Sequence, residues 1–218
     1  MKRRISAILA ADIVGYSRLA AEDEEDTVRR LAVCRNVFDE STTQYGGQVV
    51  NMVGDAILAR FSSAVDAIRC AIDVQESIRV RNLDYPPSRK MTFRIGITVG
   101  DVIDRDGQIF GDSVNIAARL EGLSPPGGIC VSRTVYEHVV NELSVAFEDI
   151  GEQQVKNIPN PIHAYVIAPH QGSGAGMGRE APKDVAKQRR YRSAVGAAIV
   201  VALVAALIAT ALRLSGSW

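Results

Sequence analysis

The chain has few cysteines and few histidines, and neither set has the spacing that builds a metal centre or a disulfide framework. Three cysteines occur in 218 residues, none in a Cys-x-x-Cys pair, and the three histidines are equally dispersed. These absences argue against a zinc site and against a small disulfide-bonded secreted fold. They fit a reducing, cytoplasmic setting. Cys70 lies within an amphipathic run and is interpreted as a small core residue.

An excess of charge of either sign is also missing. Lys plus Arg and Asp plus Glu number 25 each, so the composition gives no reason to expect a nucleic-acid partner. A secretory signal is not expected either, because Met1-Lys2-Arg3-Arg4 leads directly into a strand-like run. A hydrophobic content of 47% in 218 residues is enough for one good domain and an appendage.

Apolar periodicity predicts strands and helices that alternate along most of the chain. Strand-like runs are expected at residues 5–13, 48–53, 56–61, 91–99 with a continuation at 102–103, 129–132, 146–150 and 162–167. Helices are expected at 17–45 and 64–80, after Gly111, and at 134–140. Gly54-Asp55 has the length of a tight β-hairpin loop. Because the order has no strict βαβ repeat, it predicts an α+β fold with a mostly antiparallel sheet and helices on one face.

The C-terminal residues change character twice. Residues 169–182 are rich in Gly, as in a flexible linker, and five cations follow between residues 183 and 192. Residues 194–212 carry no charge, and as a helix they would span about 28 Å, close to the thickness of a bilayer core. We therefore predict one folded domain at 1–168, a flexible then basic linker at 169–192, a transmembrane helix at 193–213 and a short tail at 214–218.

A helix motif lies at residues 110–121. Gly111 opens the helix, and Asn115 and Arg119 follow four residues apart, so their side chains project from one face. One amide and one guanidinium on the first turns of a helix suit a ribose and a phosphate. The alternative is an ordinary amphipathic helix.

Two carboxylates lie in the segments 10–17 and 49–58. Asp12 ends the first strand and Asp55 lies on the hairpin turn. If these strands are neighbours in one sheet, both carboxylates meet at one edge, where they would form a hard oxygen site suited to Mg²⁺ or Mn²⁺. The alternative is that Asp12 caps a helix and Asp55 only makes the turn.

Taken in order, the segments 10–17, 49–58 and 110–121 resemble the class III nucleotidyl cyclases, which make cyclic AMP or cyclic GMP. The resemblance covers about residues 4 to 168 and implies a ferredoxin-like core. It implies that Asp12 and Asp55 hold two Mg²⁺ or Mn²⁺ ions. One ion would lower the pKa of the ribose 3′-hydroxyl for attack on the α-phosphorus, and the other would bind the β- and γ-phosphates.

The resemblance also assigns residues to the nucleotide. Asn115 would orient the ribose, and Arg119 would stabilise charge on the α-phosphate. Lys156 falls where the family has a phosphate-binding lysine, although the glycine that follows in the family is Asn157 here. The triphosphate would be held by backbone amides at a helix start; these belong to Ile13, Val14, Gly15 and Tyr16.

In the family, each site forms between two protomers in a head-to-tail pair, so a homodimer is implied. One chain would supply Asp12 and Asp55. The partner would supply Asn51, Gln108, Asn115, Arg119 and Lys156.

The base-reading positions depart from the usual adenylyl pattern of Lys and Asp. Asn51 and Gln108 stand there, and each amide can both donate and accept a hydrogen bond. The guanylyl pattern of Glu and Cys is absent as well. We favour ATP as substrate and an adenylate cyclase, a phosphorus-oxygen lyase. The alternatives are a guanylate or dual-specificity cyclase, or an inactive nucleotide-binding signalling module.

Two other readings of the carboxylates are less favoured. A two-metal nuclease or phosphatase would gather further carboxylates and histidines, and the Gly-Gly-Asp/Glu-Glu-Phe signature of cyclic di-GMP synthases is missing.

The excess of cations before residues 193–213 predicts a single-pass protein of the bacterial inner membrane, with the cyclase-like domain in the cytoplasm and the bilayer as partner of the C-terminal helix.

Overall fold

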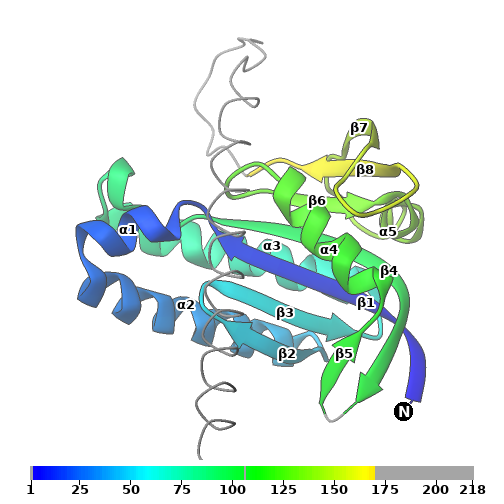
Figure 1. Ribbon diagram of the computed structural model, residues 1–218. Coiled ribbons are helices and arrows are strands. Elements are labelled where there is room, and N and C mark those ends of the chain that lie inside the picture. The colour runs from blue at the N-terminus through cyan, green and yellow to red at the C-terminus, as the bar shows by residue number, and fades with distance from the viewer. Residues whose placement is uncertain (1, 106, 170–218) are drawn as a thin grey trace, which may run out of the picture. The chain divides into compact units, whose positions relative to one another are not determined.

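The computed structural model describes residues 2–105 and 107–169. Its central element is β1, Lys2–Ile13, which lies between β3 and β4 in an eight-stranded sheet (Figure 1). Ala7, Leu9 and Ala11 of β1 are buried on one face, and Ile8 and Ala10 are buried on the other. A strand covered on both faces needs an unbroken apolar run, which this segment supplies.

The strands follow the order β2-β3-β1-β4-β6-β8-β7, and β5 pairs with β4. The sheet is mixed, because β4 and β6 are parallel while the other pairings are antiparallel. The prediction of a mostly antiparallel sheet is therefore corrected to a mixed one. The remaining strands are β2 Gln48–Val53, β3 Ala56–Phe61, β4 Phe93–Arg105, β5 Gln108–Phe110, β6 Ile129–Ser132, β7 Glu148–Gln153 and β8 Ile162–Ile167.

Helices cover both faces of the sheet, not one face as predicted. The α-helices are α1 Tyr16–Glu22, α2 Glu24–Gln44, α3 Ala64–Arg81, α4 Asp112–Leu123 and α5 Arg133–Val139. Residues of α2, α3 and α5 pack into the large core on one face. Residues of α4 pack into two smaller clusters on the other face (Figure 1).

The single helix predicted at 17–45 is two helices. Asp23 interrupts it in an extended conformation, and its side chain accepts a hydrogen bond of 3.0 Å from the Asp26 amide. An Asp at this position caps the second helix, and this local bond competes with continuation of the first. The predicted loop at 82–90 contains two short 3₁₀ turns, Asn82–Asp84 and Pro87–Arg89.

Two glycines of β4 let α4 lie directly on the sheet. A Cβ atom at Gly96 would come within 2.2 Å of the Ala117 carbonyl oxygen, and one at Gly100 would come within 2.3 Å of the Ser113 hydroxyl. Any larger residue would push the helix away. These two positions therefore fix where α4, and the side chains it carries, sit over β4.

Apart from residue 169, the predicted linker, transmembrane helix and tail lie outside the described residues. Within 2–105 and 107–169, no helix has the length and apolar character needed to cross a membrane.

Candidate active site

Asp12 and Asp55 lie at the same end of neighbouring strands. Ala11 of β1 is paired with Ile57 of β3, so Asp12 follows at the end of β1 while Asp55 occupies the turn that leads into β3. The Asp12 side chain is 19% exposed, and Asp55 is half-buried. The structure thus brings the two predicted metal ligands to one end of the strands, as the hairpin pattern indicated. We call the end of the sheet that carries Asp12 and Asp55 the carboxylate edge.

These carboxylates are suitable donors for a divalent ion. They are hard oxygen ligands at one sheet edge, which Mg²⁺ and Mn²⁺ prefer. Within the described part of the chain, no group of three or more His, Cys, Asp and Glu side chains gathers as a metal site.

Arg94 is a residue of this edge that the sequence did not reveal. It lies directly opposite Asp12 in the β1–β4 ladder, with its Nη2 3.6 Å from Asp12 Oδ2. Its Nε lies 2.9 Å from Oε1 of Glu121 on α4, and both side chains are largely buried. Arg94 is the one charged residue in the apolar run 91–99, a signal whose meaning depends on the strand register. The guanidinium gives the carboxylate edge a fixed cation.

Arg35 of α2 braces the turn that carries Asp55. Its guanidinium donates a hydrogen bond to the carbonyl oxygen of Gly54. Gly54 has a positive φ of 60°, as a tight turn requires. The contact joins residues 19 positions apart in the chain, so it could not be anticipated from local sequence.

The four predicted phosphate-binding amides do not all lie at the start of α1. Ile13 belongs to β1, and the Val14 amide donates to the Thr92 carbonyl oxygen at 2.9 Å, which extends the β1–β4 ladder by one residue. Gly15 has φ 69°, and no side chain caps the helix there. In this conformation, the amides of Gly15 and Tyr16 are the ones at the opening of α1.

Asn115 and Arg119 lie on α4, and Arg119 reaches the loop between β7 and β8. Its Nε donates to the Lys156 carbonyl oxygen at 3.1 Å, while Asn115 is exposed. Asn157 has a φ of 63°. Asn is one of the few residues that tolerate this left-handed conformation, which explains why it can stand where the family has glycine.

Asn51 and Gln108 are exposed on two strands that contact each other without pairing. Asn51 lies on β2 next to a register shift, and Gln108 lies on β5, which contacts β2. The predicted base-reading pair is therefore on one side of the molecule.

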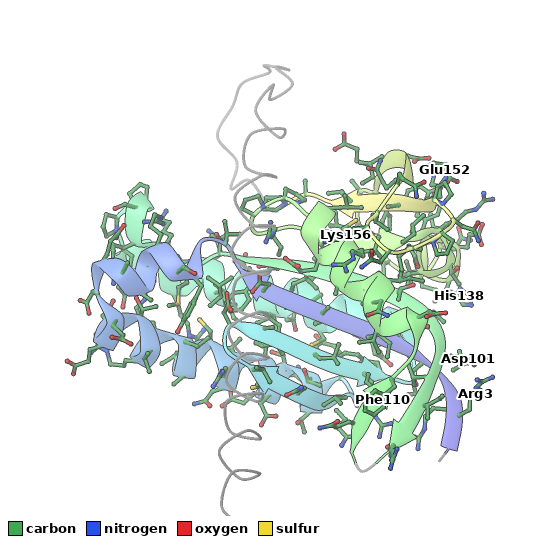
Figure 2. All side chains as sticks on the ribbon, in the orientation of Figure 1. Arg3, Asp101, Phe110, His138, Glu152 and Lys156 are labelled. Carbon is green, nitrogen blue, oxygen red and sulfur yellow. The ribbon has the colours of Figure 1, made fainter. Side chains whose placement is uncertain are left out.

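The predicted site residues fall into separate regions of one chain. Asp55 lies beside β3, whereas Lys156 lies beside β8, four strand positions away in the sheet order. At about 4.8 Å per strand, this separation is about 19 Å. Figure 2 shows Lys156 beside α4, on the side of the sheet away from β2 and β3. One chain therefore does not bring its own carboxylate edge and its own Lys156 together.

Comparison with known proteins identifies the class. Residues 3–169 match the family model for the adenylate and guanylate cyclase catalytic domain, and the chain belongs to this family. A putative adenylate cyclase 3 of Rhizobium meliloti (strain 1021) is 40% identical over 170 residues, which are 78% of this chain and 29% of that protein. An adenylate cyclase of Streptomyces coelicolor is 28% identical over 144 residues, covering 64% of this chain and 35% of that protein.

A solved structure agrees with these relatives. The crystal structure of an adenylate/guanylate cyclase/hydrolase from Silicibacter pomeroyi matches with 45% sequence identity and a TM-score of 0.73, covering 78% of this chain and 100% of that one. The chain spans only 29% of the length of the Rhizobium relative. Membership of this family implies a lyase of the adenylate or guanylate cyclase type, and class III cyclases generally depend on divalent metal ions.

Proposed function

We propose that this protein converts ATP into 3′,5′-cyclic AMP and pyrophosphate, at sites shared by two copies of the chain. One observation carries the proposal. Asp12, Asp55, Asn115 and Arg119 are all present, yet Lys156, whose carbonyl oxygen Arg119 contacts, lies beside β8, four strand positions from the turn that carries Asp55 in one chain. A head-to-tail pair with two-fold symmetry would bring the edge of one copy to α4 of the other, twice.

The reaction forms one bond and breaks one. The ribose 3′-oxygen bonds to the α-phosphorus and gives its proton to solvent water, while the bond from the α-phosphorus to the oxygen of the leaving pyrophosphate breaks. Mg²⁺ or Mn²⁺ ions held by Asp12 and Asp55 would supply activation of the hydroxyl and neutralisation of the phosphates. Asn115 orients the ribose, and the Arg119 guanidinium stabilises the charge that develops on the α-phosphate. Lys156 binds the phosphates as a point charge.

ATP is the proposed substrate, with GTP or both nucleotides as the alternative. The exposed amides of Asn51 and Gln108 can match the adenine edge, one donating and one accepting. The relatives from Rhizobium and Streptomyces carry adenylate cyclase names, which supports this choice. A non-enzymatic nucleotide-binding module is the remaining alternative, and the intact set of four functional side chains speaks against it.

The direct test is an assay of the full chain with Mn²⁺ and either ATP or GTP, with products identified by mass. We expect cyclic AMP to form faster than cyclic GMP. Cyclic GMP as the main product would overturn the substrate, and no cyclic nucleotide from either substrate would support the binding module.

We further propose that residues 193–213 anchor the protein in the bacterial inner membrane with the cyclase domain in the cytoplasm. Support comes from the uncharged run at 194–212 and from the cations that precede it. Membrane fractionation with carbonate washing tests this. The full chain should stay with the membranes, and its release by carbonate would contradict the anchor.

A further inference from the structure

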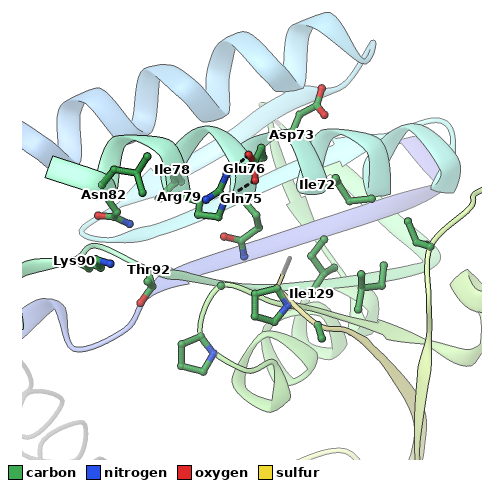
Figure 3. A pocket seen from close by; sticks show the side chains of 17 residues that line it. Ile72, Asp73, Gln75, Glu76, Ile78, Arg79, Asn82, Lys90, Thr92 and Ile129 are labelled. Carbon is green, nitrogen blue, oxygen red and sulfur yellow. Dashed lines mark hydrogen bonds and ion pairs between the residues drawn. The ribbon is translucent and has the colours of Figure 1, made fainter. Parts of the chain in front are cut away.

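A cavity of about 740 Å³ is lined by α3, by Lys90 and Thr92 just before β4, and by residues of β6 and β8 (Figure 3). Its size is within the range of small-molecule sites. Its lining comes from residues between Ile72 and Pro169, on the face of the sheet that α3 covers. Asp12, Asp55, Asn115 and Arg119 do not line it, so it is not the proposed nucleotide site.

The cavity has an apolar part and a polar part. Ile72 and Ile129 lie toward one end, while Lys90 and Thr92 lie toward the other (Figure 3). Ile167 adds further aliphatic surface to the lining. A surface of this kind suits a molecule with an apolar body and one polar group.

Lys90 is the cation that the lining leaves without an ion pair. Glu76 and Arg79 pair with each other at 2.6 Å, and Asp73 accepts a hydrogen bond from the Tyr45 hydroxyl. Half-buried Lys90 has no ion-pair partner within the described part of the chain. An ammonium at the edge of an apolar cavity favours an anionic partner.

We propose that this cavity binds a small amphipathic monocarboxylate. The carboxylate lies at Lys90, and the apolar chain lies against Ile72, Ile129 and Ile167. A single carboxylate gives Lys90 an ion-pair partner, whereas a second carboxylate would add repulsion to a lining that already holds Asp73 and Glu76.

Occupancy of the cavity is coupled to the carboxylate edge through Gln75. Its side-chain amide donates to the carbonyl oxygens of Phe93, at 3.0 Å, and of Gly128, at 2.9 Å. Phe93 directly precedes Arg94, the residue opposite Asp12. Thr92, which also lines the cavity, accepts the hydrogen bond from Val14 at the end of β1. A ligand that shifts this segment would alter the position of Arg94 relative to Asp12.

Calorimetric titration of the full chain with decanoate tests the site. We expect saturable binding of one decanoate per chain, and roughly tenfold weaker binding in Lys90→Met, which keeps the aliphatic stem but removes the charge. Ile72→Trp, which fills the apolar end, should abolish binding. Arg69→Met removes a cation of α3 that does not line the cavity and should bind like the wild type. Decanol and decylamine, with the same chain length, should bind more weakly than decanoate.

Equal binding by the wild type, Lys90→Met and Ile72→Trp would overturn the site, and so would preference for decylamine. The consequence for activity rests on the proposed function. Decanoate should change the rate of cyclic nucleotide formation in the wild type and leave Ile72→Trp unaffected. Decanoate binding without any cyclase activity would refute the proposed function but keep the carboxylate-binding site. Cyclase activity without saturable decanoate binding would keep the proposed function and refute the site.

Discussion

Asp12 and Asp55 are the single residues on which the proposed chemistry depends most. Their shared edge follows from a pattern that the sequence displays, a strand ending in Asp and a hairpin turn containing Asp. Arg94 and Arg35 could not be found in this way. Arg94 matters because the register places it opposite Asp12, and Arg35 matters because α2 packs beside the hairpin turn. Both contacts join segments that are distant in the sequence, so they depend on the tertiary structure.

Replacement of either carboxylate should remove activity and keep the fold. Asp12→Asn and Asp55→Asn preserve size but give a far poorer ligand for Mg²⁺, so we expect a loss of at least about 100-fold in kcat. Asp39→Asn, an exposed change on α2, is the matched control. Cyclic nucleotide formation and circular dichroism measure the two effects. Wild-type turnover in both variants would remove the metal assignment.

The base-reading pair predicts a change in substrate preference. Asn51→Lys with Gln108→Asp replaces two ambidextrous amides with one donor and one acceptor that match adenine. The ATP to GTP ratio of kcat/KM should rise by roughly tenfold. A ratio that falls or stays constant in the double variant means that these residues do not read the base.

At the scale of elements, the apolar pattern predicted the hairpin of β2 and β3 and the amphipathic helix α3. The boundary between α1 and α2 was missed. It depends on the Asp23 cap and on Arg89, which donates to Asp26 at 2.9 Å and to the Leu19 carbonyl oxygen at 3.0 Å. Arg89 lies in a segment distant in the sequence, so helical periodicity alone predicted one continuous helix.

Arg35 is expected to hold the turn that carries Asp55. Arg35→Met should raise the Mn²⁺ concentration needed for half-maximal activity and lower kcat/KM by roughly tenfold, because the turn loses its brace. Arg35→Lys should recover part of the loss, and Arg69→Met on α3 serves as the control. Unchanged metal dependence in Arg35→Met would show that the turn keeps its conformation without the Arg35 hydrogen bond.

The α1–α2 junction predicts a specific loss of stability in acid. The hydrogen bond from Arg29, with a further one from Arg89, holds the pKa of Asp26 below its ordinary value of 3.8. The resulting stabilisation is fully present above that ordinary value and is lost as pH falls through the lowered one. Asp26→Asn should therefore be less stable than the wild type at about pH 5, and the difference should shrink below pH 3.8. Urea unfolding at several pH values measures it, and a constant difference would contradict the pairing.

At the scale of the whole molecule, the family and the α+β class could be predicted from three motifs. The mixed sheet and the placement of α4 on its own face could not. The parallel pairing of β4 with β6 follows from the crossover through α4, and α4 lies close because Gly96 and Gly100 lack side chains. Neither glycine forms a motif in the sequence, since each acts only through the helix above it.

Complementation between two inactive chains tests the shared site most directly. Asp55→Asn and Arg119→Ala damage opposite halves of the proposed site, so each homodimer has two broken sites. In a mixed dimer, one site collects both lesions and the other collects neither. Random pairing makes about half of the dimers mixed, so co-expression should recover roughly a quarter of wild-type cyclase activity. Mixed dimers that assemble, as shown by co-purification through two different tags, but make no cyclic nucleotide would contradict a site shared between chains.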